Sequence, residues 1–363
     1  MNMTRRKFLK LAVGGGIAAG GGFLVFRNLS FGGIPSSGTA CGEYDLGCIA
    51  NHLVSGGPPK DGIPAINNPS FVAGTEAEAN RWISDNSLVD AVVTQTGPRA
   101  YPRSITVWHE IVNDTINGEK ASLTYCPLTG SSIILWGKAP DGSPLTFGTT
   151  GRLYNSNLVM YDRQTDSMYP QILGIGISGP NKGMELEQIP VTTTTWGRWK
   201  RVHPDSEVLS RQTGSFRNYD VFPYGDYDSN NSVYFPVAHQ SSQFSPKKLV
   251  IGARAGTESV AVLKDELKNL RVANLLLAGE PVVGLYDDLV DNGRLFSRTV
   301  NGDPHSFAYE NSKIVDVETS TTWDPIGQAL EGPLAGAKLR EIPSLQVMWF
   351  GWYAFHPTTA IFP

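Results

Sequence analysis

The chain has 363 residues, 18% of them charged, and a formal net charge of −4. This slightly acidic balance offers neither a basic surface for nucleic acid nor a polybasic run for anionic lipid, so no nucleic-acid partner is expected. Beyond the first 40 residues, the remaining length is enough for two domain-sized units.

The N-terminus predicts export. Residues 4–10 read Thr-Arg-Arg-Lys-Phe-Leu-Lys, and a glycine-rich apolar run follows over residues 11–26. A twin arginine ahead of such a run is typical of the twin-arginine pathway. The run is shorter than the roughly 20 residues that a spanning helix needs. We therefore expect the twin-arginine translocation machinery as a partner and an extracytoplasmic location (periplasm or cell surface), with the N-terminus either cleaved or kept as a membrane tether.

The three cysteines fall into two groups. Cys41 and Cys48 are close in sequence, and in an oxidising compartment they are expected to form a local disulfide. A lipid anchor on Cys41 is the competing interpretation, but the apolar run ends far upstream. Cys126 is then a single thiol, and outside the cytoplasm such a thiol tends to be oxidised unless it is buried or binds a metal.

The rest of the chain predicts a β-rich α+β fold. Short runs of Val, Ile, Thr and Tyr alternate with turn dipeptides such as Asn117-Gly118, Asp141-Gly142 and Asn301-Gly302. Such dipeptides between apolar runs indicate hairpins. Helical patterns are confined to residues 75–84, 104–113, 194–203 and 345–355.

An internal repeat organises these elements. A run of glycines, prolines and tryptophans recurs at a constant offset of 153 residues, as from Gly179 to Gly332 and from Trp196 to Trp349. Recurrence at a fixed offset indicates duplication. We expect an internally duplicated, pseudo-twofold sheet or barrel-like architecture. The predicted segments are an export signal or anchor with its linker (1–40), an N-terminal extension (41–94), a first repeat that carries the site (95–254) and a second repeat without one (255–363).

The first repeat contains side chains that the second lacks. His109 is predicted near the end of a short helix, and Cys126 at the end of a strand that packs beside it. Met160 follows in the same repeat, and His239 lies between the repeats. Two imidazoles, a thiolate and a weak thioether are the ligands of blue-copper sites. Cysteine and two histidines with a water would suit zinc.

The leading interpretation is therefore an exported copper or zinc protein with a redox or metal-handling role and a redox partner. Tyr154 and Asn155 are expected at the edge of the cofactor. A second interpretation is a thiol-dependent enzyme with Cys126 as nucleophile, His109 as base, and Glu110 or Asn155 orienting it. A third is an extracellular binding or structural module in which Tyr154 and Tyr161 line a groove.

Four motifs resemble an exported family known as domain of unknown function family 3179. They are Trp108–Asp114, Thr124–Gly130, Leu153–Asp162 and the His-Pro-Asp stretch at His203, and they cover about residues 95 to 255. Many members have a second cysteine where this chain has Thr129, so a dithiol mechanism is not available here. The family has no established activity, so the resemblance implies no mechanism.

Overall fold

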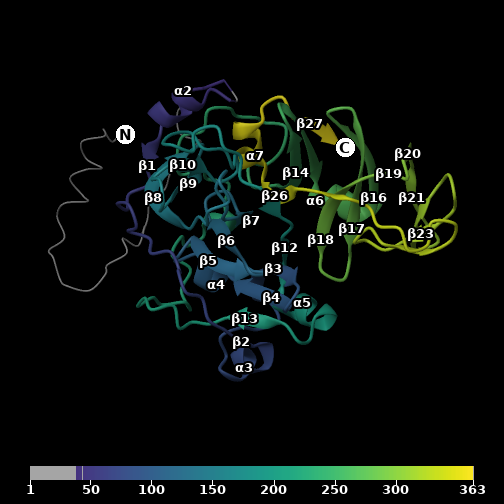
Figure 1. Ribbon diagram of the computed structural model, residues 1–363, viewed down its shortest axis with the longest axis horizontal. Coiled ribbons are helices and arrows are strands. Elements are labelled where there is room, and N and C mark those ends of the chain that lie inside the picture. Colours follow the sequence, from purple (N-terminus) through teal and green to yellow (C-terminus); the bar gives the residue numbers. More distant parts are fainter. Residues whose placement is uncertain (1–37, 43, 363) are drawn as a thin grey trace.

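The structure is a computed structural model that describes residues 38–42 and 44–362 (Figure 1). The predicted twin-arginine signal lies outside the described residues. The described chain consists of many short strands and a few short helices, which confirms the β-rich class. None of its helices is long and apolar enough to cross a membrane. The helices are α2 (Leu46–Asn51), α3 (Gly74–Ala79), α4 (Arg103–Thr106), α5 (Trp196–Val202), the 3-10 turn η1 (Tyr227–Ser229), α6 (Lys264–Leu270) and α7 (Trp349–Phe355).

Three sheets form the first half of the molecule, and each is named here after one of its strands. The β9 sheet has the order β1 (Val54–Ser55), β8 (Phe147–Tyr154), β9 (Asn157–Asp162) and β10 (Met168–Pro170). The β6 sheet has the order β11 (Gln188–Ile189), β7 (Ser131–Trp136), β6 (Glu119–Cys126) and β5 (Ile111–Ile116). The β3 sheet has the order β12 (Thr192–Thr195), β3 (Leu88–Thr94), β4 (Gly97–Pro102), β13 (Glu207–Leu209) and β2 (Phe71–Ala73).

The second half repeats this plan of three sheets. The β14 sheet has the order β26 (Ser344–Met348), β14 (Leu249–Ala255), β15 (Glu258–Leu263) and β27 (Ala360–Phe362). The β17 sheet has the order β16 (Val272–Leu277), β17 (Glu280–Asp287), β18 (Asn292–Ser297) and β25 (Glu341–Ile342). The β22 sheet has the order β21 (Phe307–Glu310), β22 (Lys313–Asp316), β23 (Thr322–Trp323) and β24 (Ala329–Glu331), beside the hairpin of β19 (Thr299–Val300) and β20 (Asp303–Pro304).

The barrel-like closure expected from the sequence is not found. Each sheet of the described chain begins and ends on different strands, so all of them are open. Closure would require the two edge strands of one sheet to pair with each other. Here the sheets stack face to face instead, and the strands of the two halves occupy opposite ends of the molecule (Figure 1).

Side-chain alternation along the strands builds these stacks. In β7, Ile134 belongs to the core between the β3 and β6 sheets, whereas Ile133 and Leu135 belong to the core between the β6 and β9 sheets. Successive side chains of a strand point to opposite faces. In the second half, Val282 and Val283 divide in the same way between two cores. Both middle sheets are therefore buried on both faces.

Two of the predicted turns have the backbone that hairpins need. Asn117 and Gly118, between β5 and β6, have φ values of 54° and 85°. Asn301 and Gly302, between β19 and β20, have φ values of 54° and 97°. Positive φ at both central residues is the signature of a type I′ turn, whose twist matches that of the paired strands.

The prediction of a helix over residues 104–113 is wrong for the second half of that segment. The helix α4 ends at Thr106, and Glu110 has a φ of 58°, which a right-handed helix does not allow. From Ile111 the chain continues as β5, where Ile111 pairs with Thr124 of β6. Burial between two sheets stabilises the strand, and this tertiary contact outweighs the local helical pattern.

The two halves share local contacts around their tryptophans. Trp199 Nε1 donates to Ser206 Oγ at 2.8 Å, and Trp352 Nε1 donates to Thr359 Oγ1 at 3.0 Å. Each indole also lies with its ring centroid 4.2 Å from that of the histidine four residues later. All four tryptophans of the two motifs are fully buried, as expected from the repeat.

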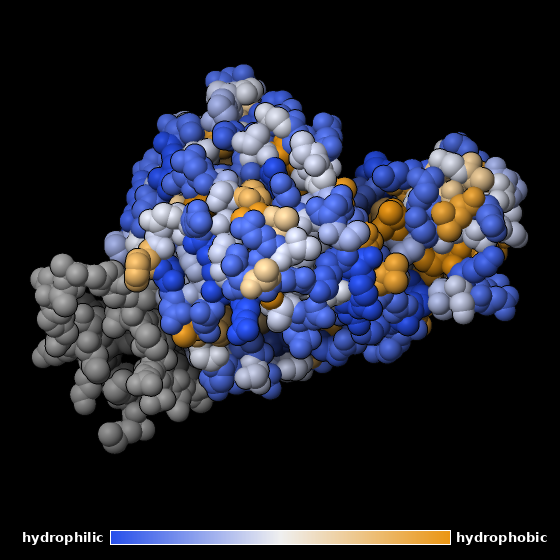
Figure 2. All heavy atoms as spheres, turned by 90° about the horizontal axis from the view of Figure 1, so that it is seen from below, coloured by the Kyte–Doolittle hydropathy of each residue, from blue (hydrophilic) through white to orange (hydrophobic). Residues whose placement is uncertain are grey.

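A space-filling view of one face shows where apolar side chains reach the surface (Figure 2). They gather on the lobe at the right of the view, which is the lobe of the β22 sheet. Exposed apolar residues of this half include Leu276, Tyr309 and Leu330. In the first half, Trp108, Trp196 and Trp199 are buried, and Trp82 and Trp136 are partly buried.

Candidate functional site

Cys126 ends β6 with its thiol buried between the β6 and β9 sheets, and its side chain is 1% exposed. The backbone N–H of Leu158 donates to Sγ at 3.4 Å, and the thiol faces the carbonyl oxygen of Ser156 at 3.9 Å. Burial raises the pKa of Cys126, while hydrogen bonds from Thr129 and Leu158 lower it. The thiol is therefore protonated at neutral pH but lies among donors that would stabilise its anion.

Glu110 is the charged partner of this thiol. The turn between α4 and β5 places it there, and its backbone carbonyl oxygen accepts from Tyr125 N at 2.7 Å. Its side chain is 8% exposed, and among the described residues no side chain or backbone group donates a hydrogen bond to its carboxyl group. Burial raises the pKa of Glu110 to about 8. The charge of Glu110 in turn raises the pKa of Cys126.

A small apolar pocket opens beside this pair. Its volume is about 50 Å³, and Glu110 is the one acidic residue in a wall of apolar and aromatic side chains. Cys126 lies one layer behind the wall, since the N–H that contacts its sulfur belongs to Leu158, which lines the pocket. The other lining residues are Gly56, Pro58, Ile63, Leu128, Gly151, Arg152, Leu153, Tyr224, Tyr234 and Phe235.

A larger cleft lies outside the pocket. It has a volume of about 510 Å³ and shares Pro58, Gly151 and Arg152 with the inner pocket. Lys60 and Tyr161 also line it, with the ammonium group of Lys60 3.8 Å from the ring centroid of Tyr161. The two cavities are therefore neighbours: charged residues of both signs line the outer one, and apolar side chains with Glu110 line the inner one.

A buried polar network supports the thiol from behind. The amide oxygen of Gln171 accepts from Ser131 Oγ at 2.7 Å and from Asn157 Nδ2 at 2.9 Å. Its amide nitrogen donates to Thr124 Oγ1 at 3.0 Å, and Asn157 Nδ2 donates to Thr129 Oγ1 at 3.0 Å. All five side chains are fully buried. The network thus fixes Thr129, whose hydroxyl hydrogen-bonds the thiol.

The second half of the molecule holds the loop that follows Cys126. The backbone N–H of Met348 donates to Thr129 O at 2.9 Å, and Asn155 Nδ2 donates to Ala354 O at 2.8 Å. The Cβ of an alanine at position 351 would lie 2.9 Å from Thr129 Cγ2, so Gly351 allows α7 to approach this closely. The helix α7 therefore supports the thiol loop from the far end of the chain.

His109 does not contact Cys126 in this structure. Its Nδ1 lies 2.7 Å from Pro64 O and its Nε2 lies 2.7 Å from Tyr219 Oη, so both ring nitrogens are engaged. Burial lowers the pKa of His109 to about 4, which keeps the imidazole neutral. Its position therefore holds the segment near Pro64 and the loop near Tyr219 together.

The predicted metal ligands do not converge. Among the described residues, His109, Cys126 and His239 form no group of three donors with ligand atoms within 4.8 Å of one another. Met160 is fully buried in the same core as Cys126, and His239 is partly exposed. The donors as placed do not fit a copper or zinc ion. Both metals stay predictions, which metal analysis of the purified protein tests.

Tyr154 and Asn155 have structural contacts. The ring of Tyr154 packs edge-on against Phe355 at 5.7 Å between centroids. Asn155 has a φ of 52° in the turn between β8 and β9, and its Oδ1 accepts from Ala238 N at 2.8 Å. Both residues thus connect the site to the second half and to the segment before His239.

Sequence reasoning named Glu110 only as an orienting residue and did not name Gln171 or Tyr224. The one available signal was a glutamate next to the apolar pair Ile111 and Val112, because charged residues are rarely buried unless paired. The loop with Tyr224 lies far away in sequence. Burial raises the pKa of Tyr224, and the charges of Glu110 and Cys126 raise it further.

Comparison with known proteins identifies a family whose function is unknown. A family model described as "Protein of unknown function (DUF3179)" matches residues 60–359. This confirms the resemblance and extends it over the second half of the chain. No curated protein and no solved structure matches the chain.

Proposed function

The chain belongs to the DUF3179 family, and we propose that it is an exported thiol-dependent enzyme with Cys126 as nucleophile and Glu110 as its proton acceptor. The main support for the proposal is the environment of the Glu110 carboxyl group. A carboxyl group that is buried, receives no hydrogen bond among the described residues and lines a pocket beside a thiol has no evident structural role. Strongly perturbed ionisable groups in a cleft are the common mark of a catalytic site.

The chemistry that fits is acyl transfer. The carboxylate form of Glu110 takes the proton of the Cys126 thiol, directly or through one water, and the thiolate attacks a carbonyl carbon. The protonated Glu110 then donates to the leaving group, which leaves a thioester. Water hydrolyses the thioester and restores the thiol. No oxidant is needed, and no second free cysteine is present for disulfide exchange.

The two cavities indicate the substrate class. The inner pocket, at about 50 Å³, has room for a short apolar acyl group, since one water occupies about 30 Å³ in the liquid. The outer cleft would hold a polar remainder near Lys60, Arg152 and Asp166. The wall at Leu158 must move for the carbonyl carbon to reach the sulfur, so we expect a site that opens during turnover.

Hydrolysis of a short-chain p-nitrophenyl ester tests the proposal. Cys126→Ser is expected to abolish turnover, and Glu110→Gln to lower kcat/KM by roughly 10² to 10⁴. Because the base acts in its ionised form, kcat/KM of the wild type should rise with pH through about 8. An acyl adduct on Cys126 should be seen by mass spectrometry. Full activity in Cys126→Ser would contradict the assignment of the nucleophile.

Alkylation of the thiol tests the Cys126–Glu110 pair without a substrate. Cys126 is the free cysteine of this chain, so a small reagent such as iodoacetamide reports on it alone. Glu110→Gln removes a nearby negative charge, so the apparent pKa of Cys126 in the rate profile should fall. Glu119→Gln, a change of an exposed glutamate, is the matched control and should leave the profile unchanged. An unchanged profile in Glu110→Gln would show that the groups do not interact.

We also infer that the two halves arose by duplication, with the site kept in the first half and the second half as its support. The matched sheet orders and tryptophan contacts support this inference, as does an asparagine clasp in each half. Asn113 Nδ2 donates to Phe147 O at 2.8 Å and its Oδ1 accepts from Phe147 N at 2.8 Å. Asn274 makes the same two bonds to Phe307, at 2.7 and 3.0 Å.

If the clasps are equivalent, Asn113→Ala should lower the free energy of unfolding by about 2 kcal/mol, because two buried backbone groups are left unpaired. Asn274→Ala should lower it by about 1 kcal/mol, because Asn274 is exposed and water replaces part of its bonding. Denaturant titration measures both. Only Asn113→Ala is expected to alter turnover as well. An unchanged free energy of unfolding at either position would remove this support for the duplication.

A further inference from the structure

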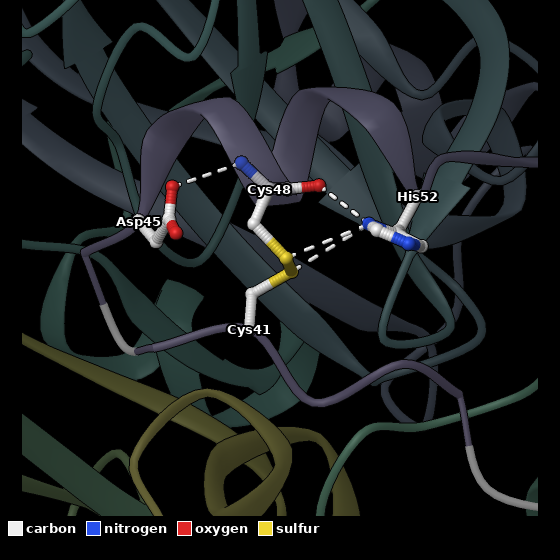
Figure 3. Close-up of a disulfide and its surroundings, with 4 residues drawn as sticks. All are labelled: Cys41, Asp45, Cys48 and His52. Atoms are coloured by element: carbon white, nitrogen blue, oxygen red, sulfur yellow. Dashed lines mark hydrogen bonds between the residues drawn. A yellow bond between two sulfur atoms is a disulfide. The ribbon is translucent and has the colours of Figure 1, made fainter.

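Three soft or borderline metal donors meet at α2 (Figure 3). Cys41 and Cys48 form the predicted disulfide, with their Cα atoms 5.6 Å apart. His52 follows directly after α2, and its Nδ1 lies 3.5 Å from Cys48 Sγ and 3.8 Å from Cys41 Sγ. The three donor atoms all lie within 4.8 Å of one another.

Local structure produces this grouping. Cys48 and His52 are four residues apart, so they lie on the same face of the helical turn. Asp45 caps the helix through a bond from Cys48 N at 2.9 Å, and the chain before it brings Cys41 back to the same face. Cys41 is buried, Cys48 is partly exposed and His52 is exposed. The group is thus anchored on one side and open to solvent on the other.

We propose that this group is a zinc site that forms when the disulfide is reduced. A dithiol reductant supplies two electrons and two protons, so the S–S bond breaks, two cysteine thiols form, and the reductant becomes a disulfide. Binding of Zn²⁺ then releases the two thiol protons and gives a site of two thiolates and one imidazole. The site is independent of the proposed enzyme function and lies outside the segment of residues 60–359 that the family model matches.

The dimensions suit a tetrahedral ion. With Zn–S bonds of about 2.3 Å, the two sulfurs of a tetrahedral site lie about 3.8 Å apart. Reduction breaks the S–S bond, and the two sulfurs are then free to take this separation while the Cα atoms stay 5.6 Å apart. His52 Nδ1 now lies 2.8 Å from Cys48 O, so the exposed ring must turn or change tautomer to coordinate. Two cysteines, one histidine and a water form a known type of zinc site.

Zinc binding by the oxidised and reduced full chain tests the proposal. Protein with Cys126→Ser, which removes the remaining thiol, is reduced with dithiothreitol, desalted without oxygen and titrated with Zn²⁺ against a chromophoric chelator. We expect one equivalent of Zn²⁺ to bind the reduced form and none to bind the oxidised form at this site. Reoxidation should release the ion.

Variants separate the ligands from general unfolding. His52→Ala leaves the disulfide able to form and should weaken zinc binding of the reduced protein at least tenfold. His239→Ala, a histidine outside the group, is the matched control and should bind as the parent does. Circular dichroism of the reduced parent confirms that it stays folded. Equal zinc binding by the oxidised and reduced proteins, or by the parent and His52→Ala, would overturn the proposal.

Discussion

Glu110→Gln is expected to stabilise the protein at alkaline pH and to have little effect at acidic pH. The unfolded chain loses the proton of Glu110 near pH 4.5, whereas the folded protein keeps it until about pH 8. Between these values the folded state binds more protons, so the free energy of unfolding falls as pH rises. At about 1.4 kcal/mol per pKa unit, the full cost is on the order of 5 kcal/mol above pH 8. Glutamine carries no charge and avoids this cost.

Urea titrations at pH 4.5, 7 and 9 measure the effect as the difference between wild type and variant, which cancels the other titrating groups. The gain in free energy of unfolding of Glu110→Gln over the wild type should be near zero at pH 4.5 and largest at pH 9. Glu119→Gln is again the control, and its difference should not depend on pH because the residue is exposed. A pH-independent difference for Glu110→Gln would mean that the carboxyl group is solvated. Together with the expected loss of turnover, a stability gain would show that Glu110 is retained for chemistry.

Gln171→Leu is expected to destabilise the protein by about 3 to 5 kcal/mol. Leucine has a similar size, so the effect arises from hydrogen bonding. The change removes the hydrogen bonds that Ser131, Asn157 and Thr124 make to this amide, inside a core that excludes water. Each lost buried hydrogen bond costs about 1 kcal/mol, and more where a polar group is left without a partner. Thermal or denaturant unfolding measures the loss.

Gln164→Leu is the matched control on the surface. Gln164 is exposed and hydrogen-bonds Thr146 through both ends of its amide, at 3.0 and 3.3 Å. Water replaces these bonds, so the loss should stay below about 1 kcal/mol. Gln171→Leu should also change the alkylation rate of Cys126, because Thr129 loses its fixed position. Equal effects of the two substitutions would show that the buried network adds no stability.

Much of the fold follows from the sequence alone. Alternating apolar residues specify strands, and Asn117-Gly118 and Asn301-Gly302 specify hairpins, because these are local properties of the chain. The disulfide between Cys41 and Cys48 follows from proximity in sequence. The repeated tryptophan motif predicted two sets of buried indoles, and the structure contains both.

Other features depend on residues distant in sequence. The segment after Glu110 has a helical pattern and yet forms β5, because pairing with β6 and burial on both faces stabilise the strand more than local propensity stabilises the helix. Sequence spacing allowed His109 to approach Cys126. In the structure Pro64 and Tyr219 engage both of its ring nitrogens, and neither partner is near it in sequence.

The sequence by itself determined the β-rich class, the two hairpin turns and the disulfide, because each depends on neighbouring residues. Only the tertiary structure decided which group accompanies the thiol. Glu110, with a positive φ, directly precedes β5, and its backbone oxygen accepts from Tyr125 N, next to Cys126 in β6. Its raised pKa comes from burial by Leu128, Leu158 and Tyr224, which distant parts of the chain supply. Burial of a charge is a property of the assembled fold, and no local pattern encodes it.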